Sequence, residues 1–360
     1  MKLDVFLMGS KDGTYRQFVD QVVLAEELGL DGAWLAERHF ANGDLLWPSP
    51  LVAAAFLAAR TERIRIGLAA RVLPLHHPLH VAADAATVDT LSGGRLDLGL
   101  SRGSMDDAPH RAFGVSREEA RLRFDEATEI LLRALRGEPF SFHGRHYELN
   151  DVVPAPRCVQ RPHPPVYLVA NNPASLDAAA DHGLPVFLNG ALAAGEIAGR
   201  LERYQARARA AGHEVETSGL PVNRFVFVGE SKAHARRAMR EPFLQFLERR
   251  APDLRAYLVE RQGGAPSFEQ LAERIAIFDD AEGCAARLEE LEALGVGHVL
   301  CTFNLPTLGQ AAAVSSMRRF AAEVAPLFQG EGTRGPRSVA PRSAVRTKEV
   351  KERRPRALVG

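Results

Sequence analysis

The residues best suited to chemistry stand directly after short apolar runs of the sequence. One such run ends in Glu37, Arg38 and His39. His39 is the member of this triplet whose ordinary pKa lies near neutrality, so it could act as an acid or a base. Another run ends in Ser101 and Arg102, and the planar guanidinium of arginine can donate two hydrogen bonds to a phosphate or carboxylate. These positions predict a polar site with a proton-transfer residue and an anion-binding residue.

Two further groups could complete such a site. Asn171 and Asn172 begin a helical pattern that also contains Ser175. Free amides at a helix start can bind an anion, although the same residue types are ordinary helix caps. Ala69 and Ala70 are small residues inside an apolar run, which either let a ligand approach the backbone or fill a tightly packed layer. If the fold brings all four groups together, the site suits a phosphorylated cofactor.

Metal and disulfide chemistry find weaker support. His76, His77 and His80 form a local cluster, but they begin a helix and lack nearby cysteines or spaced carboxylates, so we predict no metal site. The three cysteines are widely spaced and odd in number. This pattern argues against a disulfide framework and favours a reducing, cytoplasmic compartment.

The elements that must position these side chains alternate regularly along the chain. Eight apolar or β-branched runs, each followed by a helical pattern, lie between residues 3 and 329. This alternation predicts parallel strands joined by helical crossovers. Eight units favour an α/β fold of the (β/α)8 TIM barrel type, whose sites lie at the carboxyl ends of the strands. A doubly wound open sheet is the alternative, but the glycine-rich fingerprint that it normally carries does not follow the first run.

The expected strands are 3–8, 32–37, 64–72, 96–102, 165–171, 184–190, 221–229 and 297–303. Two segments interrupt the alternation. We expect a small hairpin within the insertion at about 137–164, because PFSFHGRHYEL has strand-forming residues on both sides of a glycine. The insertion at about 251–280 contains several prolines and glycines and is interpreted as a long loop or lid.

Composition divides the chain into a barrel domain, 1–329, and a basic tail, 330–360. The formal net charge is zero, with 45 basic and 45 acidic residues; nine of the basic and three of the acidic residues lie in the tail. The tail is rich in proline, glycine, serine and arginine, so we expect it to be disordered. It has no aromatic residue to stack on a base, and we predict no nucleic-acid partner. No apolar run is long enough to cross a membrane.

Several motifs in register resemble the bacterial luciferase-like flavin-dependent monooxygenases. They are AERHF at 36–40, RVLPLHHP at 71–78, LSGGRLDLG at 91–99, SRG at 101–103 and PVYLVA at 165–170. The resemblance runs from residue 1 to about 329 and excludes the tail. It implies a (β/α)8 barrel that uses reduced FMN or, less often, the deazaflavin F420.

The resemblance also implies roles for individual residues. His39 matches the catalytic histidine of the family. Ala69 and Ala70 match the position of a non-proline cis peptide beneath the flavin ring. The flavin-phosphate positions are matched by Arg102, Asn171, Asn172 and Ser175. Ser101, counted with the cofactor-binding residues, stands where bacterial luciferase has a reactive cysteine, so light emission is in doubt. The Gly-Thr-Pro turn that the family often has before its last unit is replaced here by IFDD at 277–280.

The activity implied is two-component oxygenation. A separate NAD(P)H:flavin reductase would supply reduced FMN, and O2 would oxygenate a small organic substrate, an aldehyde, a ketone or a secondary metabolite. An F420-dependent dehydrogenase or reductase on the same fold, a non-catalytic flavin-binding partner subunit and a metal-dependent barrel hydrolase are the alternatives. The alanine-rich helix expected at 48–60 has an apolar face, and helices near this position often dimerise in the family, so we expect a homodimer.

Overall fold

The computed structural model describes residues 1–8, 14–40, 47–103, 107–170, 172–188, 192–249, 255–256, 259 and 266–329. Asn171 and the basic tail lie outside these residues. Eight strands form the barrel in the order in which they follow one another along the chain, and each neighbouring pair is parallel. They are β1 (Lys2–Leu7), β2 (Gly32–Leu35), β3 (Arg65–Val72), β4 (Leu96–Ser101), β7 (Val166–Val169), β8 (Val186–Phe187), β9 (Val222–Val228) and β11 (His298–Thr302).

The ring of strands closes at two places. β11 pairs with β1, with Lys2 opposite His298, and one bridge joins Leu188, just after β8, to Val222 of β9. Each of the eight expected strands is therefore present. The expectation of a (β/α)8 barrel is confirmed, and the doubly wound open sheet is wrong.

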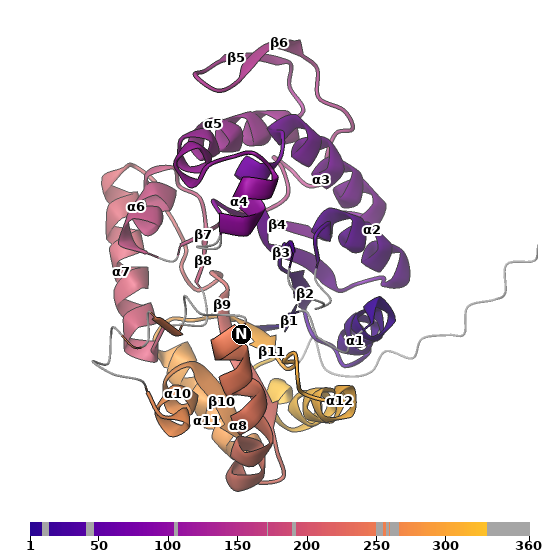
Figure 1. The fold of residues 1–360 in the computed structure, drawn as a ribbon, viewed down its shortest axis with the longest axis vertical. Coiled ribbons are helices and arrows are strands. Elements are labelled where there is room, and N and C mark those ends of the chain that lie inside the picture. Colours follow the sequence, from indigo (N-terminus) through magenta and orange to yellow (C-terminus); the bar gives the residue numbers. More distant parts are fainter. Residues whose placement is uncertain are drawn as a thin grey trace, which may run out of the picture.

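Helices surround the strands (Figure 1). They are α1 (Tyr15–Glu27), α2 (Pro50–Arg60), α3 (Pro78–Ser92), α5 (Arg117–Arg136), α6 (Pro173–Asp181), α7 (Ala194–Ala210), α11 (Ala281–Ala293) and α12 (Gln310–Arg319), the last continued by short π and 3-10 turns to Leu327. Local sequence sets their ends. Thr14 and Gln17 form a reciprocal capping box before α1, and the Ser116 hydroxyl accepts the Glu119 N–H at 3.1 Å before α5. Gly93 ends α3 with a left-handed φ of 67°.

The insertion at 137–164 contains the expected hairpin. β5 (Phe140–His143) and β6 (Glu148–Val152) pair antiparallel and project beyond α3 and α5 (Figure 1). The short helix α4 (Asp107–Ala112) and a 3-10 turn, η1 (Leu73–Leu75), are the remaining elements near the carboxyl ends of β3 and β4.

The interpretation of 251–280 as an irregular loop is wrong for its described second half. There, α10 (Phe268–Ile275) is followed by β10 (Ala276–Asp279), a ninth strand that pairs parallel with the end of β9. Phe268, Leu271 and Ile275 lie on one helix face and are buried. The prolines and glycines that favour a loop lie at 252–266, before this segment, and the loop prediction should have ended with them.

A second apolar core forms around these elements. Phe243 of α8 (Lys232–Arg249) contacts Phe225 of β9 and Phe278 of β10, with ring centroids 5.0 and 5.2 Å apart. Leu305, just after β11, belongs to the same core. α8, α10 and β10 are thus fixed to the barrel beside the ends of β9 and β11 rather than forming a free lid.

Polar residues fill the barrel near the amino ends of the strands. Asp4 Oδ2 accepts hydrogen bonds from Trp34 Nε1 at 2.6 Å and His298 Nε2 at 2.7 Å. Arg65 donates to both carboxylate oxygens of Asp97, at 2.7 and 2.8 Å. Residues at this end of a barrel generally serve stability, and these pairs neutralise charges that are mostly buried.

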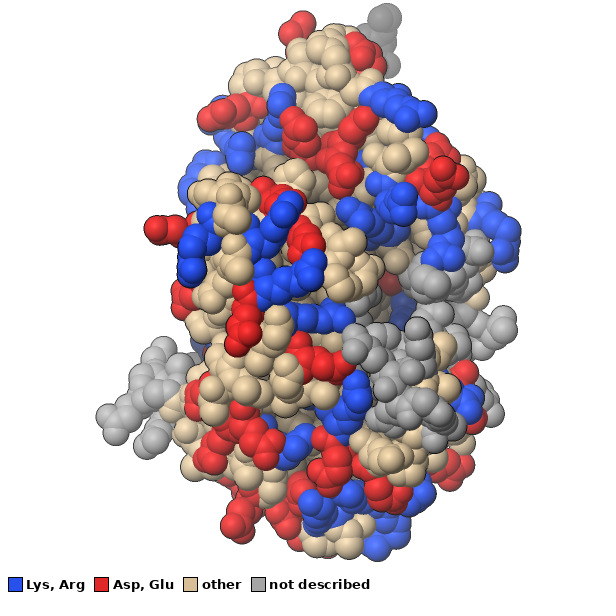
Figure 2. All heavy atoms as spheres, turned by 90° about the vertical axis from the view of Figure 1, so that its left-hand side faces the viewer, with Lys and Arg blue, Asp and Glu red and all other residues tan. Residues whose placement is uncertain are grey.

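Two surface properties bear on possible partners. In Figure 2, Lys and Arg are intermingled with Asp and Glu over the visible face instead of gathering into one patch of a single sign. Of the helices in the described ranges, none is both long and apolar enough to cross a membrane.

Candidate active site at the carboxyl ends of the strands

The residues predicted to form the site lie at one edge of four consecutive strands. His39 follows β2, Ala69 and Ala70 lie in the second half of β3, and Ser101 ends β4. The pairing register keeps these ends level, because Leu35 is opposite Leu68 and Val72 is opposite Ser101. Arg102 follows Ser101 directly, and the Asn172 and Ser175 positions follow β7, the next strand.

Glu37 organises the part of the site around β2 and β3. Its Oε1 lies 2.6 Å from His39 Nε2 and 2.7 Å from His76 Nε2. Its Oε2 accepts the Val72 N–H at 2.9 Å and forms an ion pair with Arg71 at 3.1 Å. Burial alone would raise the pKa of Glu37, but the hydrogen bonds from the two histidines and the charge of Arg71 outweigh it and lower the pKa to about 2.

Sequence reasoning named His39 but missed this network. Glu37 was read only as part of a charged triplet, and His76 was dismissed with its neighbours as the start of a helix. His76 in fact precedes α3 and follows the 3-10 turn at the end of β3. The signal that was available is the position of His76 just beyond a strand end, the same signal that selected His39.

The three groups could also be read as metal ligands. Glu37 Oε1, His39 Nε2 and His76 Nε2 all lie within 4.8 Å of one another. Tetrahedral ligands about 2.1 Å from a zinc ion would lie roughly 3.4 Å apart, whereas the two histidine nitrogens lie at hydrogen-bond distances from the carboxylate oxygen. The guanidinium of Arg71 on the same carboxylate adds a positive charge that opposes a dication.

The Arg102 side chain is held in place by an aromatic ring and a carboxylate. Its guanidinium lies over the Phe124 ring, 5.2 Å from the centroid, and contacts Asp125 at 3.4 Å. About a third of the side chain is exposed. It is therefore a cation at a strand end that can still donate to an anion.

The start of α6 has fewer free amides for an anion than the sequence suggested. Asn172 Oδ1 accepts the Ser175 N–H at 2.9 Å, and the Ser175 hydroxyl donates back to Asn172. Pro173 has no N–H, so Ala174 carries the remaining first-turn amide. The reading of these residues as an ordinary helix cap is thus confirmed, and an anion here would meet one free amide instead of several.

The small residues between these groups match their expected conformation. The Ala69–Ala70 peptide bond is cis, as the resemblance implied. Ala69 contacts an apolar group inside the barrel that includes Trp34 and Phe187, and the Ala70 carbonyl accepts the Glu37 N–H at 3.2 Å. The roles of this pair and of Ser101 toward a cofactor stay predictions.

Aromatic rings border the histidines. The Phe113 ring lies 5.0 Å from the His39 ring and 6.2 Å from the His76 ring, and Phe40 lies 5.8 Å from Phe113. Phe113 is 41% exposed and Phe40 is 60% exposed. Large apolar side chains at the edge of a polar cluster are typical of ligand sites.

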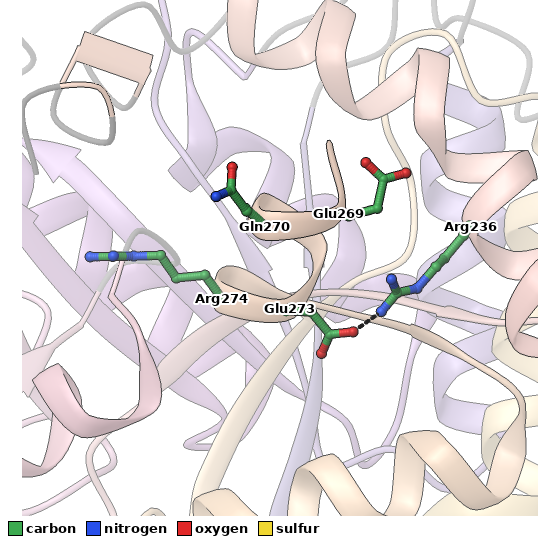
Figure 3. Close-up of a pocket in the computed structure, with 5 residues that line it drawn as sticks. All are labelled: Arg236, Glu269, Gln270, Glu273 and Arg274. Carbon is green, nitrogen blue, oxygen red and sulfur yellow. Dashed lines mark hydrogen bonds and ion pairs between the residues drawn. The ribbon is translucent and has the colours of Figure 1, made fainter. Parts of the chain in front are cut away.

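A separate hollow lies on the surface between α8 and α10 (Figure 3). Glu269 and Glu273 face α8, where Glu273 pairs with Arg236, while Gln270 and Arg274 point to the other side. Arg274 pairs with Glu196 at 2.8 Å. These residues are charge-paired and do not lie on the loops that follow β2, β3 and β4.

Comparison with known proteins agrees with the fold. The profile of the luciferase-like monooxygenases matches residues 1–298. The chain belongs to this family of flavin-dependent monooxygenases.

Three relatives illustrate the range of the family. An uncharacterised protein of Sinorhizobium fredii, y4wF, is 40% identical over 174 residues, which cover 48% of this chain and 50% of that protein. The alkanal monooxygenase alpha chain of the Kryptophanaron alfredi symbiont is 32% identical, covering 53% of each chain. The oxygenase component of a flavin-dependent trigonelline monooxygenase from Acinetobacter baylyi is 27% identical, covering 64% and 65%. This chain thus spans between half and two thirds of these relatives.

Solved structures extend the similarity over most of the chain. Monooxygenase RslO1 from Streptomyces bottropensis superposes with a TM-score of 0.81 at 26% identity, covering 91% of this chain and all of the other. The oxygenating constituent of a 3,6-diketocamphane monooxygenase from Pseudomonas putida, solved with FMN, gives 0.76 at 20% identity, covering 91% and 99%. An F420-dependent tetrahydromethanopterin reductase from Methanopyrus kandleri gives 0.74 at 20% identity with the same coverage. The last two show the fold alone.

Proposed function

We propose that the protein is the oxygenase component of a two-component system that uses reduced FMN and O2 to oxygenate a small organic carbonyl compound or secondary metabolite. The observation that carries the proposal is the placement of His39 and Arg102 at strand ends on either side of the small pair Ala69 and Ala70. The described relatives include an oxygenase component, which supports a separate NAD(P)H:flavin reductase as partner.

The residues present fit a flavin mononucleotide. Arg102 is a fixed, partly exposed cation with one 3.4 Å carboxylate contact among the described residues, so it suits the phosphate. The Ala174 amide follows the next strand, β7, and Ser175, whose hydroxyl is donated to Asn172, stays in the proposed cofactor-binding set. The small side chains of Ala69 and Ala70 would let a flat ring lie close to the backbone. Asn171, Asn172 and Ser101 complete the proposed cofactor-binding set.

When bound, reduced flavin would supply the two electrons that activate O2, so that one oxygen atom enters the substrate and the other leaves as water. The protein's own tasks are orientation, exclusion of water and proton transfer. We assign the proton transfer to His39, because its Nε2 is held by Glu37 and, among the described residues, its Nδ1 has no hydrogen-bond partner. Phe113 and Phe40 would shield the site from water.

Product and H2O2 analysis tests the proposal, because reduced FMN consumes O2 with or without a substrate. Purified protein supplied with reduced FMN by a reductase should form an oxygenated product and release less H2O2 when the substrate is present, and His39→Gln should bind FMN normally but form no oxygenated product. Arg102→Ala should weaken binding of FMN but not of riboflavin, which lacks the phosphate. Full oxygenation by His39→Gln would overturn the role of His39.

The second candidate is an F420-dependent reductase or dehydrogenase, because an F420-dependent enzyme is among the solved structures that share this fold. Hydride transfer with F420 and no O2 consumption would establish it in place of oxygenation. A non-catalytic flavin-binding subunit would bind FMN and show neither reaction. We also propose a homodimer through α2, where Val52 and Phe56 are exposed on one face.

A further inference from the structure

The protons at the Glu37 carboxylate can be assigned from its four partners. Both oxygens accept hydrogen bonds: Oε1 faces the Nε2 atoms of His39 and His76, and Oε2 accepts the Val72 N–H and forms an ion pair with Arg71. A carboxylate surrounded by donors is ionised and has no proton to give. Both histidine Nε2 atoms must therefore carry the hydrogen of these bonds.

This assignment fixes the other nitrogen of each ring. In its neutral form an imidazole has one N–H and one bare nitrogen, so in the neutral form of each ring, with Nε2 bonded to Glu37, the Nδ1 atoms of His39 and His76 are bare acceptors. Among the residues that the structure describes, neither Nδ1 has a recorded partner. The side chains are 8% and 18% exposed, so both rings are nearly buried yet not sealed from solvent.

Two further features surround this pair of acceptors. Phe113 and Phe40 present exposed aromatic surface beside the His39 ring. Arg71 is 8% exposed, and among the residues that the structure describes its Nε and Nη1 are buried without a hydrogen-bond acceptor. A buried donor without a partner costs free energy unless a ligand or water satisfies it.

We propose that His39, His76 and Phe113, held by Glu37, form a subsite for an aromatic ring that carries a hydroxyl group. The hydroxyl hydrogen would be donated to a bare Nδ1, and the ring would pack against Phe113. An aliphatic aldehyde has neither a hydroxyl donor nor a ring and uses neither feature. Glu37 is a positioning residue here, because it acts through the two histidines. The inference rests on the proposed function in that it names the substrate class of that site.

Binding without turnover tests the subsite separately from the reaction. Calorimetry with oxidised FMN present would compare 1-naphthol with 1-methoxynaphthalene, which keeps the ring and the oxygen but has no hydroxyl hydrogen. We expect 1-naphthol to bind about tenfold more tightly, the effect of one hydrogen bond in a protected site, and decanal to compete weakly. Equal affinity for the two naphthalene compounds would overturn the proposal, whether or not the protein consumes O2.

The variants are chosen to remove one nitrogen at a time. His76→Gln keeps a donor for Glu37 but has no counterpart of Nδ1, and the 1-naphthol preference should fall at least threefold; His39→Gln should do the same. His143→Gln is the matched control, because His143 lies on the exposed hairpin and pairs with Glu148 there, and it should leave the preference unchanged. A preference that survives in both site variants contradicts the assignment of the acceptors.

Nitrogen NMR measures which ring nitrogen of each histidine carries hydrogen, and a purely structural role of Glu37 would not change this pattern. In protein labelled with 15N-histidine, long-range proton–nitrogen spectra should show two rings with Nε2 protonated and Nδ1 bare, each lost in one of the two glutamine variants. Glu37→Gln should disturb both patterns together, while Glu129→Gln on the exposed face of α5 should disturb neither. Nδ1-protonated rings in the unsubstituted protein would refute the tautomer assignment.

Discussion

Replacing Glu37 by glutamine should cost the protein a sizeable part of its stability. The neutral isostere keeps the shape but not the charge, and its amide hydrogens would face the Val72 N–H and Arg71 or the two histidines. A pKa of about 2 in the folded chain, in place of 4.5, corresponds at about 1.4 kcal/mol per unit to roughly 3 kcal/mol of unfolding free energy at pH 7.

The pH dependence follows from the direction of this pKa shift. Because folding lowers the pKa, the contribution is complete above pH 4.5 and is lost as the pH falls toward 2. Urea unfolding followed by the fluorescence of the two buried tryptophans, Trp34 and Trp47, would measure it at pH 7, 4.5 and 3. The control, Glu129→Gln, breaks an exposed pair with Arg133 and should change stability by at most about 0.5 kcal/mol.

Two results would refute this reasoning about Glu37. One is a Glu37→Gln protein within about 1 kcal/mol of the unsubstituted chain at pH 7, which would mean that the charge contributes little. The other is a difference between the two proteins that is as large at pH 3 as at pH 7, which would assign the effect to packing instead of ionisation.

Three further predictions concern other parts of the chain. Gly99→Ala should lower the stability by at least about 3 kcal/mol or prevent folding, because the new Cβ would lie 2.0 Å from a backbone carbonyl oxygen. Gly195→Ala is the control and should be neutral or slightly stabilising, because open space surrounds that glycine. Equal urea midpoints for the two variants would contradict this prediction. Burial opposes the charged form of His298, but Asp4 outweighs it and raises the pKa of His298. The stability lost in His298→Gln should therefore be largest below pH 6.5 and shrink as the pH rises through the raised pKa. A loss of stability that does not change with pH in urea titrations would contradict this prediction. Phe56→Asp should convert a dimer to a monomer in light scattering, and an unchanged mass would remove α2 from the interface.

Much of the architecture could be predicted because it depends on local periodicity. The alternation of apolar runs and helical patterns predicted all eight barrel strands, and with them the shared edge where His39 and Arg102 stand. α10 was missed because prolines and glycines before it outweighed its short buried face, Phe268 to Ile275. Partners were harder to predict than positions. That Glu37 joins His39 to His76 depends on the register of β2 and β3 and on the turn after β3, which no local pattern encodes.

The closure between β8 and β9 has a consequence for how the barrel fluctuates. In the described residues, β8 has two residues and meets β9 through one bridge, supported by Arg224, which is buried and donates to the Leu192 carbonyl at 2.9 Å. β3 and β4, in contrast, share five paired positions. Among the described residues this is the contact between neighbouring strands with the fewest paired positions, and local opening should begin there at the lowest cost in free energy. Amide hydrogens of β8 should exchange with solvent before those of β3 and β4, with the rest of the barrel still closed.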